Sequence, residues 1–149
     1  MSVLALDTAT AHCTVAFAGR SAGVDAPTGH AEQLAELIRA VVPDPAGITS
    51  IVVGVGPGPY TGLRVGVVTA ATLAEALAVP AAGVCSLDGL GWRIGDGVVA
   101  TDARRKEVFA ASYDAAGVRL AGPDVLRPAD AETRLPVVGE GAVLYAESF

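Results

Sequence analysis

The sequence predicts an α/β fold of two lobes, and three observations support this prediction. Short aliphatic runs alternate with longer segments of helical periodicity, which is typical of sheets covered by helices. A stretch rich in glycine and proline, residues 54–66, separates a run of β-branched residues from an apolar helix. After the turn at residues 95–97 the strand pattern starts again, so we expect one lobe over residues 1–94 and a second over residues 95–149.

The first lobe is expected to follow the order β-β-β-α-β-α-β. Its strands are predicted over residues 3–6, 14–18, 22–24, 50–55 and 81–85. A first helix is predicted over residues 31–42, where four apolar residues share one helical face: Leu34, Leu37, Ile38 and Val41. A second helix is predicted over residues 61–78. Pro43 and Pro80 lie just beyond these helices and end them.

The second predicted helix is apolar on nearly all sides. Small residues recur on it every four positions, namely Gly62, Gly66, Ala70 and Ala74. The opposite side also carries apolar residues, among them Val65, Val68 and Leu73. Such a helix has to be covered on most sides, either by its own sheet or by a partner protein.

The second lobe is expected to follow a short helix near residues 86–93. Strands are predicted over residues 98–102, 107–113 and 118–120, with a hairpin turn at residues 115–117. A small helix over residues 128–135 and a strand at residues 137–138 complete the expected elements. The strand pattern of the first lobe is thus repeated, but without a second pair of long helices.

The composition excludes several classes of protein. Of the 149 residues, 52% are hydrophobic and only 17% are charged, so a disordered chain is not expected. No apolar run is long enough for a membrane span, and the first residues lack the basic region of a signal peptide. Cys13 and Cys85 lie in separate apolar runs, which favours buried thiols in a reducing cytoplasm.

The charge balance argues against a protein that binds nucleic acid by itself. Ten basic and sixteen acidic residues give a formal net charge of −6, whereas nucleic-acid binding depends on Lys and Arg side chains at phosphates. The one basic cluster, Arg104-Arg105-Lys106, is expected to be a solvated turn.

The glycine-rich stretch matches neither of the common phosphate-binding motifs. A P-loop has Lys and then Ser or Thr after its last glycine, and these do not follow Gly62. The dinucleotide-binding pattern fails because Thr61 stands in place of its third glycine. Pro57 and Pro59 also remove two backbone N–H donors. The stretch is therefore predicted to serve shape, either as a sharp turn with close packing or as a loop near a partner.

The polar residues of the chain argue against independent catalysis. His12 and His30 are its only histidines and do not have the spacing of a metal-binding pair on a helix. Asp7 and Asp102 lie at strand ends, and a weak nucleotide site that uses them is kept as an alternative. The simpler interpretation is that these carboxylates cap turns or form salt bridges. No Gly-x-Ser-x-Gly pattern suggests a serine hydrolase.

Three motifs together resemble one protein family. They are residues 5–10 (Ala-Leu-Asp-Thr-Ala-Thr), residues 56–64 (Gly-Pro-Gly-Pro-Tyr-Thr-Gly-Leu-Arg) and residues 102–109 (Asp-Ala-Arg-Arg-Lys-Glu-Val-Phe). Their order is similar to that of the TsaB (YeaZ) family in the actin-like ATPase (ASKHA) superfamily. The chain departs from the family pattern at Pro59 and Tyr60, where Ser and Phe are usual. The family also usually continues beyond the end of this chain.

The resemblance implies an actin-like, ribonuclease H-like lobe of mixed sheet and helices, followed by a shortened second lobe of the same type. The implied motif residues are Asp7, Thr8, Thr10, Gly56, Pro57, Gly58, Thr61, Gly62, Arg64, Asp102, Arg104 and Glu107. In the family, the two long helices of the first lobe form a dimer face. The residues that this implies here are Leu34, Leu37, Ile38, Val41, Gly62, Val65, Gly66, Thr69 and Leu73.

The resemblance also implies an accessory role. TsaB-like proteins pair with TsaD, a related protein that carries the chemistry, and they work with the ATPase TsaE. Together these proteins transfer a threonylcarbamoyl group to the adenosine beside the anticodon of tRNA, which gives t6A. We therefore expect a cytoplasmic, non-catalytic scaffold without cofactor or metal, which forms a homodimer in isolation and meets tRNA only through the complex. A weak actin-like ATPase and a self-associating structural protein are the alternatives.

Overall fold

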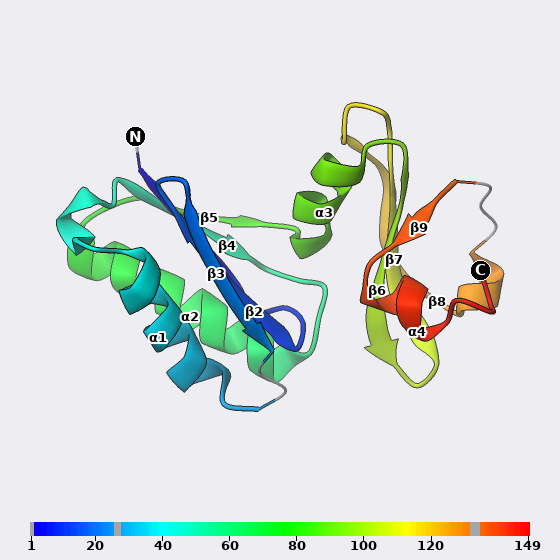
Figure 1. The fold of residues 1–149 in the computed structure, drawn as a ribbon, viewed down its shortest axis with the longest axis horizontal. Coiled ribbons are helices and arrows are strands. Elements are labelled where there is room, and N and C mark those ends of the chain that lie inside the picture. Colours follow the sequence, from blue (N-terminus) through cyan, green and yellow to red (C-terminus); the bar gives the residue numbers. More distant parts are fainter. Residues whose placement is uncertain (1, 26–27, 132–134) are drawn as a thin grey trace. The chain divides into compact units, whose positions relative to one another are not determined.

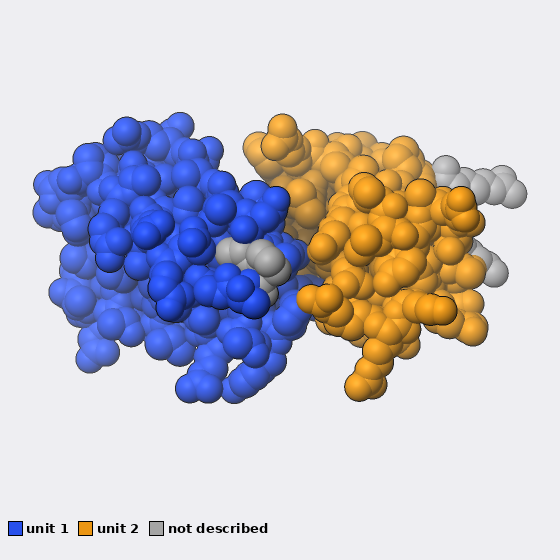
Figure 2. Space-filling view, turned by 60° about the horizontal axis from the view of Figure 1, so that its bottom comes forward, with its two compact units in different colours: residues 1–84 blue, residues 85–149 orange. Residues whose placement is uncertain are grey.

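The computed structural model describes residues 2–25, 28–131 and 135–149. The chain divides into two compact units, residues 1–84 (unit 1) and residues 85–149 (unit 2), coloured separately in Figure 2. The boundary therefore precedes the helix α3 (Ser86–Ile94), which corrects the predicted boundary at residue 94. The reason is that Leu87 of α3 is buried in a cluster with Val99 and Tyr113 of unit 2.

Unit 1 is a five-stranded sheet with two helices (Figure 1). Its strands are β1 (Val3–Asp7), β2 (His12–Phe17), β3 (Arg20–Asp25), β4 (Ser50–Gly54) and β5 (Ala81–Val84). Its helices are α1 (His30–Val41) and α2 (Tyr60–Leu77), with a short 3₁₀ turn, η1 (Pro45–Gly47), before β4. The strand order is β3-β2-β1-β4-β5, in which β1, β4 and β5 are parallel and β2 is antiparallel to both neighbours. The predicted order of elements is confirmed.

The core of unit 1 lies between the sheet and both helices. Alternate residues of β1, β2 and β4 are buried, because successive side chains of a strand point to opposite faces. Helix α1 covers β2 and β3, and α2 covers β4, on the same face of the sheet (Figure 1). The core residues are Leu4, Leu6, Val15, Phe17, Leu34, Val41, Val42, Ile48, Ile51, Val53, Ala70 and Ala74. Each helix thus buries one face against the sheet, and its opposite face is exposed.

Unit 2 has a four-stranded sheet in the order β8-β7-β6-β9. Its elements after α3 are β6 (Gly97–Arg104), β7 (Glu107–Tyr113), β8 (Arg119–Leu126), the 3₁₀ turn η2 (Pro128–Asp130), β9 (Val137–Val138) and α4 (Glu140–Leu144). Both faces of the sheet carry a core. Leu87 packs with Val99 and Tyr113 on one face, and Tyr145 packs on a cluster with Ala100 and Val108 on the other.

Unit 2 differs from the sequence prediction in three places. Strand β8 continues to Leu126 instead of ending at residue 120, because an edge strand tolerates a proline such as Pro123. Where the sequence predicts a helix over residues 128–135, the structure has the single turn η2, and residues 132–134 lie outside the described residues. Helix α4 is missing from the prediction because its five residues are too few to show a helical pattern.

Candidate functional site

The first two motifs meet in unit 1, where the turn between β1 and β2 packs on the start of α2. The link is Thr8, whose side chain is fully buried. Its hydroxyl donates a hydrogen bond to the carbonyl oxygen of Gly62 (2.8 Å) and accepts one from the N–H of Gly66 (3.1 Å). In an undisturbed α-helix these two backbone groups would bond to each other. Thr8 therefore bonds to both members of one step of the hydrogen-bond ladder of α2.

Glycines make this close approach possible. A Cβ atom on Gly58 would overlap the backbone of Ala9, and one on Gly66 would overlap the hydroxyl of Thr8. A Cβ atom on Gly62 would lie 2.6 Å from the carbonyl oxygen of Thr8, which is too close for a real contact. The glycines of this motif therefore bring α2 against the turn of its own unit, which agrees with the packing interpretation of the stretch.

Asp7 and His30 hold the β1–β2 turn from two sides. Asp7 Oδ1 accepts a hydrogen bond from the N–H of Ala9 at 2.7 Å, which closes an Asx turn. The Nε2 atom of His30, the first residue of α1, lies 3.1 Å from the carbonyl oxygen of Thr10. Asp7 thus caps the turn, as the simpler interpretation predicts. The contribution of His30 is missing from the sequence prediction, because a lone histidine belongs to no pattern.

The remaining residues of these two motifs play local or exposed parts. Thr10 Oγ1 accepts a hydrogen bond from the N–H of His12 at 3.1 Å. Gly56 is buried and adopts a φ of 92°, in the left-handed region that favours glycine. Thr61 and Arg64 are exposed in the first turns of α2. Thr10 and Gly56 therefore shape loops, whereas Thr61 and Arg64 lie on the outer surface of α2.

The chemistry at this junction is that of a packed turn. The backbone of Ala9 fills the space beside Gly58, and Pro57 has no N–H to donate. Burial and the nearby Asp7 carboxylate raise the pKa of Cys13, so this buried thiol stays protonated at neutral pH.

Within the described residues, no three His, Cys, Asp or Glu side chains gather as metal ligands would. No helix in the described part of the chain is long and apolar enough to cross a membrane.

The third motif forms the turn between β6 and β7 in unit 2. Asp102 Oδ1 accepts hydrogen bonds from the N–H of Arg104 (3.0 Å) and from the hydroxyl of Tyr145 (3.2 Å). Asp102 Oδ2 lies 3.7 Å from Nε of Arg104, and Glu107 is in register with Arg104 across the hairpin. Burial, with the Asp102 carboxylate, raises the pKa of Tyr145, which keeps its hydroxyl a donor. Asp102 is therefore also a turn cap.

The residues predicted for the partner interface lie on the inner sides of α1 and α2. Four are buried, namely Leu34, Val41, Gly62 and Gly66. Five are half-buried, namely Leu37, Ile38, Val65, Thr69 and Leu73. The five half-buried residues keep part of their surface exposed, so the expectation that this set faces a partner stays a prediction. Gly62 and Gly66 are buried because Thr8 bonds to α2 on its glycine side, which turns that side toward the sheet.

The outer side of α2 carries a different apolar stripe. Tyr60 is 76% exposed, Val68 is 55% exposed and Val67 is 38% exposed. Arg64 and Ala71 are exposed on the same side. These positions follow the spacing of one helical face. We call Tyr60, Arg64, Val67, Val68 and Ala71 the outer stripe of α2.

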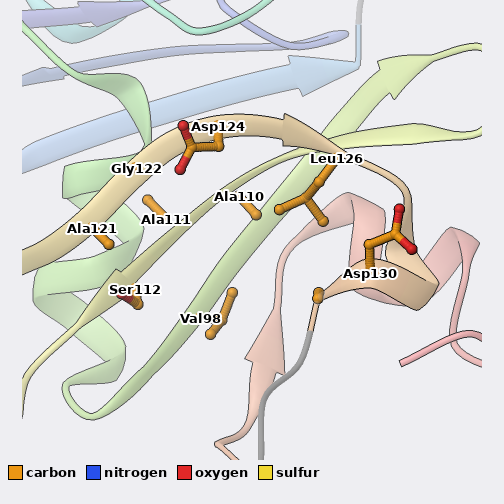
Figure 3. A pocket seen from close by; sticks show the side chains of 10 residues that line it. Val98, Ala110, Ala111, Ser112, Ala121, Gly122, Asp124, Leu126 and Asp130 are labelled. Atoms are coloured by element: carbon orange, nitrogen blue, oxygen red, sulfur yellow. The ribbon is translucent and has the colours of Figure 1, made fainter.

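A hollow of about 320 Å³ lies in unit 2, beside the irregular pairing of β7 with β8 (Figure 3). Its lining is mainly alanine and other apolar residues of β6, β7 and β8. Its charged members are Asp124 and Asp130, and Asp130 Oδ2 is already 2.7 Å from Nε of Arg127. This lining does not identify a ligand, so the hollow carries no functional assignment.

Comparison with known proteins identifies the family. A family model described as TsaD, tRNA N6-adenosine threonylcarbamoyltransferase, matches residues 24–143. The structure of YeaZ from Pseudomonas aeruginosa matches 99% of this chain and 79% of its own, with a TM-score of 0.85 and 30% sequence identity. The chain belongs to the TsaB (YeaZ) family. Its mixed α/β fold is accordingly the actin-like fold of that family, as the sequence predicts.

Sequence relatives extend this match. An uncharacterized protein of Mycobacterium leprae is 46% identical over 96% of this chain, but the chain spans only 45% of that relative. An uncharacterized protein of Mycobacterium tuberculosis is 42% identical over 99% of this chain, which spans 75% of it. The tRNA threonylcarbamoyladenosine biosynthesis protein TsaB of Escherichia coli is 31% identical over 76% of this chain, and the match covers 55% of that protein.

Proposed function

We propose that this TsaB-family chain is a non-catalytic scaffold subunit in the biosynthesis of t6A in tRNA. It pairs with a TsaD-type catalytic protein and works with a TsaE-type ATPase, and it meets tRNA within that complex. The observation that carries the proposal is the outer stripe of α2, which exposes an aromatic ring and two valines. Exposed apolar patches of this kind mark sites of protein association.

The outer stripe changes which residues the proposed interface uses. Four of the nine predicted residues are buried and five are half-buried, whereas Tyr60, Val67 and Val68 are exposed. Because Tyr60, Arg64, Val67, Val68 and Ala71 occupy positions i, i+4, i+7, i+8 and i+11, a partner helix laid along α2 would cover all of them. The same stripe is the proposed contact of a homodimer when the partner is missing.

The state of the motif side chains supports an accessory role. Asp7 and Asp102 each spend one carboxylate oxygen on a backbone N–H two residues ahead. The buried Thr8 hydroxyl is engaged with two backbone groups of α2. Side chains used in this way hold turns in place, and they are not presented to a substrate as a nucleophile or a general base would be.

The experiment is light scattering coupled to size exclusion, on the chain alone and mixed with the TsaD-type protein from the same source. Val68→Arg puts a charge into the outer stripe and is expected to weaken the mixed complex at least tenfold, since burying an unpaired charge is strongly unfavourable. Val143→Arg is the matched control, because Val143 is an 80% exposed valine on α4 in unit 2. It should leave the complex intact.

Two results would count against the proposal. One is a wild-type chain that forms no complex at micromolar concentration. The other is a Val68→Arg chain that binds the TsaD-type protein as tightly as the Val143→Arg chain does. In the second case the two proteins pair, but through a surface other than the outer stripe.

A further inference from the structure

The β6–β7 turn has an unusual backbone. Outside glycine, five described residues have a φ in the left-handed region. Two are single alanines, Ala18 and Ala78. The other three are consecutive at this turn: Arg104 (φ 67°), Arg105 (φ 54°) and Lys106 (φ 65°). Single residues other than glycine adopt a positive φ occasionally, but three consecutive residues with long side chains rarely do.

Other residues would fit this turn with less backbone strain. Arg105 and Lys106 are the two residues that join β6 to β7, both with positive φ, as in a type I′ hairpin turn. Asn-Gly fits such a turn with the least crowding, because Gly lacks a Cβ and Asn tolerates the left-handed region. The chain instead keeps two cations there. Backbone strain of this kind is concentrated at positions where the side chains serve a function.

The turn is anchored by Asp102, and its basic side chains are exposed. Asp102 holds the N–H of Arg104 and the hydroxyl of Tyr145, which ties the turn to the segment after α4. All three basic residues are exposed. Arg104 lies beside Asp102, whereas in the described part of the chain neither Arg105 nor Lys106 forms an ion pair. Two exposed positive charges therefore lie at the tip of the hairpin.

This turn holds the only run of consecutive basic residues in the sequence. The formal net charge is −6, and the seven basic residues outside the turn occur singly along the sequence. A polyanion that approaches this chain is repelled by most of the acidic surface and attracted where positive charge is concentrated. The turn has no aromatic side chain for base stacking, so its chemistry suits the sugar–phosphate backbone and not the bases.

We infer that the β6–β7 turn contacts phosphates of an RNA backbone through Arg105 and Lys106. This inference rests on the proposed function, in which the chain is part of a complex that acts on tRNA. It goes further by giving this subunit a direct contact with the RNA. The contact positions the RNA and does not select its sequence, because phosphates carry no sequence information.

The test replaces the two cations by the residues that suit the turn. The double variant Arg105→Asn/Lys106→Gly should fold at least as stably as the wild type, with an unchanged or higher melting temperature, because it relieves the left-handed strain. In complex with the TsaD-type protein, it should bind a fluorescently labelled tRNA transcript more weakly. The logarithm of the binding constant falls as the logarithm of the salt concentration rises. The magnitude of this slope should be smaller by about 2 in the variant, one for each lost phosphate contact.

The matched control removes two cations elsewhere. Arg20→Gln/Arg93→Gln takes away the same charge from two separate exposed positions, at the start of β3 and in the last turn of α3. It should change the affinity for the transcript less than twofold, because the two arginines share no phosphate site. An equal loss of affinity in both double variants would show a general charge effect and would overturn the inference.

Two further outcomes separate this inference from the proposed function. If the turn variant joins the TsaD-type protein and binds tRNA with the wild-type affinity and salt slope, the inference fails and the scaffold role stands. If the turn variant no longer joins that protein, the cations serve an acidic protein surface and the RNA contact is refuted. If the wild-type chain joins no TsaD-type protein, the proposed function fails, and the inference that depends on it fails as well.

Discussion

Two hairpin turns of this protein are built by the same local device and put to opposite uses. Asp7 ends β1 and Asp102 lies near the end of β6, and each accepts a hydrogen bond from the backbone N–H two residues ahead. After Asp7 the chain continues with the small residues Thr8 and Ala9, both fully buried. After Asp102 it continues with Ala103 and then with three exposed basic residues, of which Arg104 is the first.

The difference between these turns lies in what covers them. The β1–β2 turn is packed under α2, so its side chains are selected for size and for the hydrogen bonds of Thr8. The β6–β7 turn has its basic residues at the surface, so charge can be placed there without desolvation. An Asx cap thus shapes both turns, and the surroundings of each turn decide what its side chains do.

The largest expected effect tests how tightly the first turn is packed. Gly58→Ala should lower the free energy of unfolding by about 3 kcal/mol, because the new Cβ overlaps the backbone of Ala9, which cannot move aside as a side chain can. Gly89→Ala is the control, since a Cβ there meets nothing within 4 Å. Because Gly89 lies within α3, alanine should raise stability by about 0.5–1 kcal/mol. Urea denaturation measures both, and equal effects would contradict the packing described for the turn.

The next prediction compares two buried threonines. Thr8 is satisfied by α2, whereas the hydroxyl of Thr101 on β6 finds no hydrogen-bond partner among the described residues. Thr8→Val should therefore cost about 1–2 kcal/mol of stability, and Thr101→Val should raise stability by about 1 kcal/mol. Urea denaturation of both variants should therefore show changes in the free energy of unfolding of opposite sign. If Thr8→Val were neutral, the hydroxyl of Thr8 would not be what holds α2 to the turn.

The smallest effect concerns Tyr113, the fully buried tyrosine of unit 2. Burial raises the pKa of Tyr113, and so does its hydrogen bond to Asp88 Oδ1 at 3.0 Å. Since the native state holds this proton more tightly than the unfolded state does, its stabilisation is complete below the unfolded pKa of about 10 and is lost above it, at about 1.4 kcal/mol per pH unit.

Tyr113→Phe isolates this contribution. At pH 7 it should lower stability by about 1 kcal/mol, through loss of the hydrogen bond to Asp88. Above pH 10 its stability should fall less steeply than that of the wild type, because the titrating hydroxyl is gone. Denaturant titrations at several pH values between 8 and 11 measure the slope. Parallel curves for the two proteins would mean that Tyr113 does not hold its proton as described.

Much of the fold could be predicted because it depends on local pattern. The apolar period of residues 34–41 and the proline after it predict α1, and aliphatic runs predict the first strands of both units. The turn caps follow from the position of an aspartate before a tight turn. The continuation of β8 to Leu126 and helix α4 were beyond such patterns, because an exposed edge strand and a five-residue helix depend on what they pack against.

The sequence by itself determined the order of elements in unit 1, the turns capped by Asp7 and Asp102, and the need to cover α2 on most sides. Only the tertiary structure decided which side of α2 faces inward. A helix that is apolar all round has no preferred direction in its own pattern, so periodicity could not separate the glycine side from the valine side. The hydroxyl of Thr8 makes that choice from more than fifty residues away in sequence, by bonding to Gly62 and Gly66. The outer stripe of α2 is exposed as a consequence.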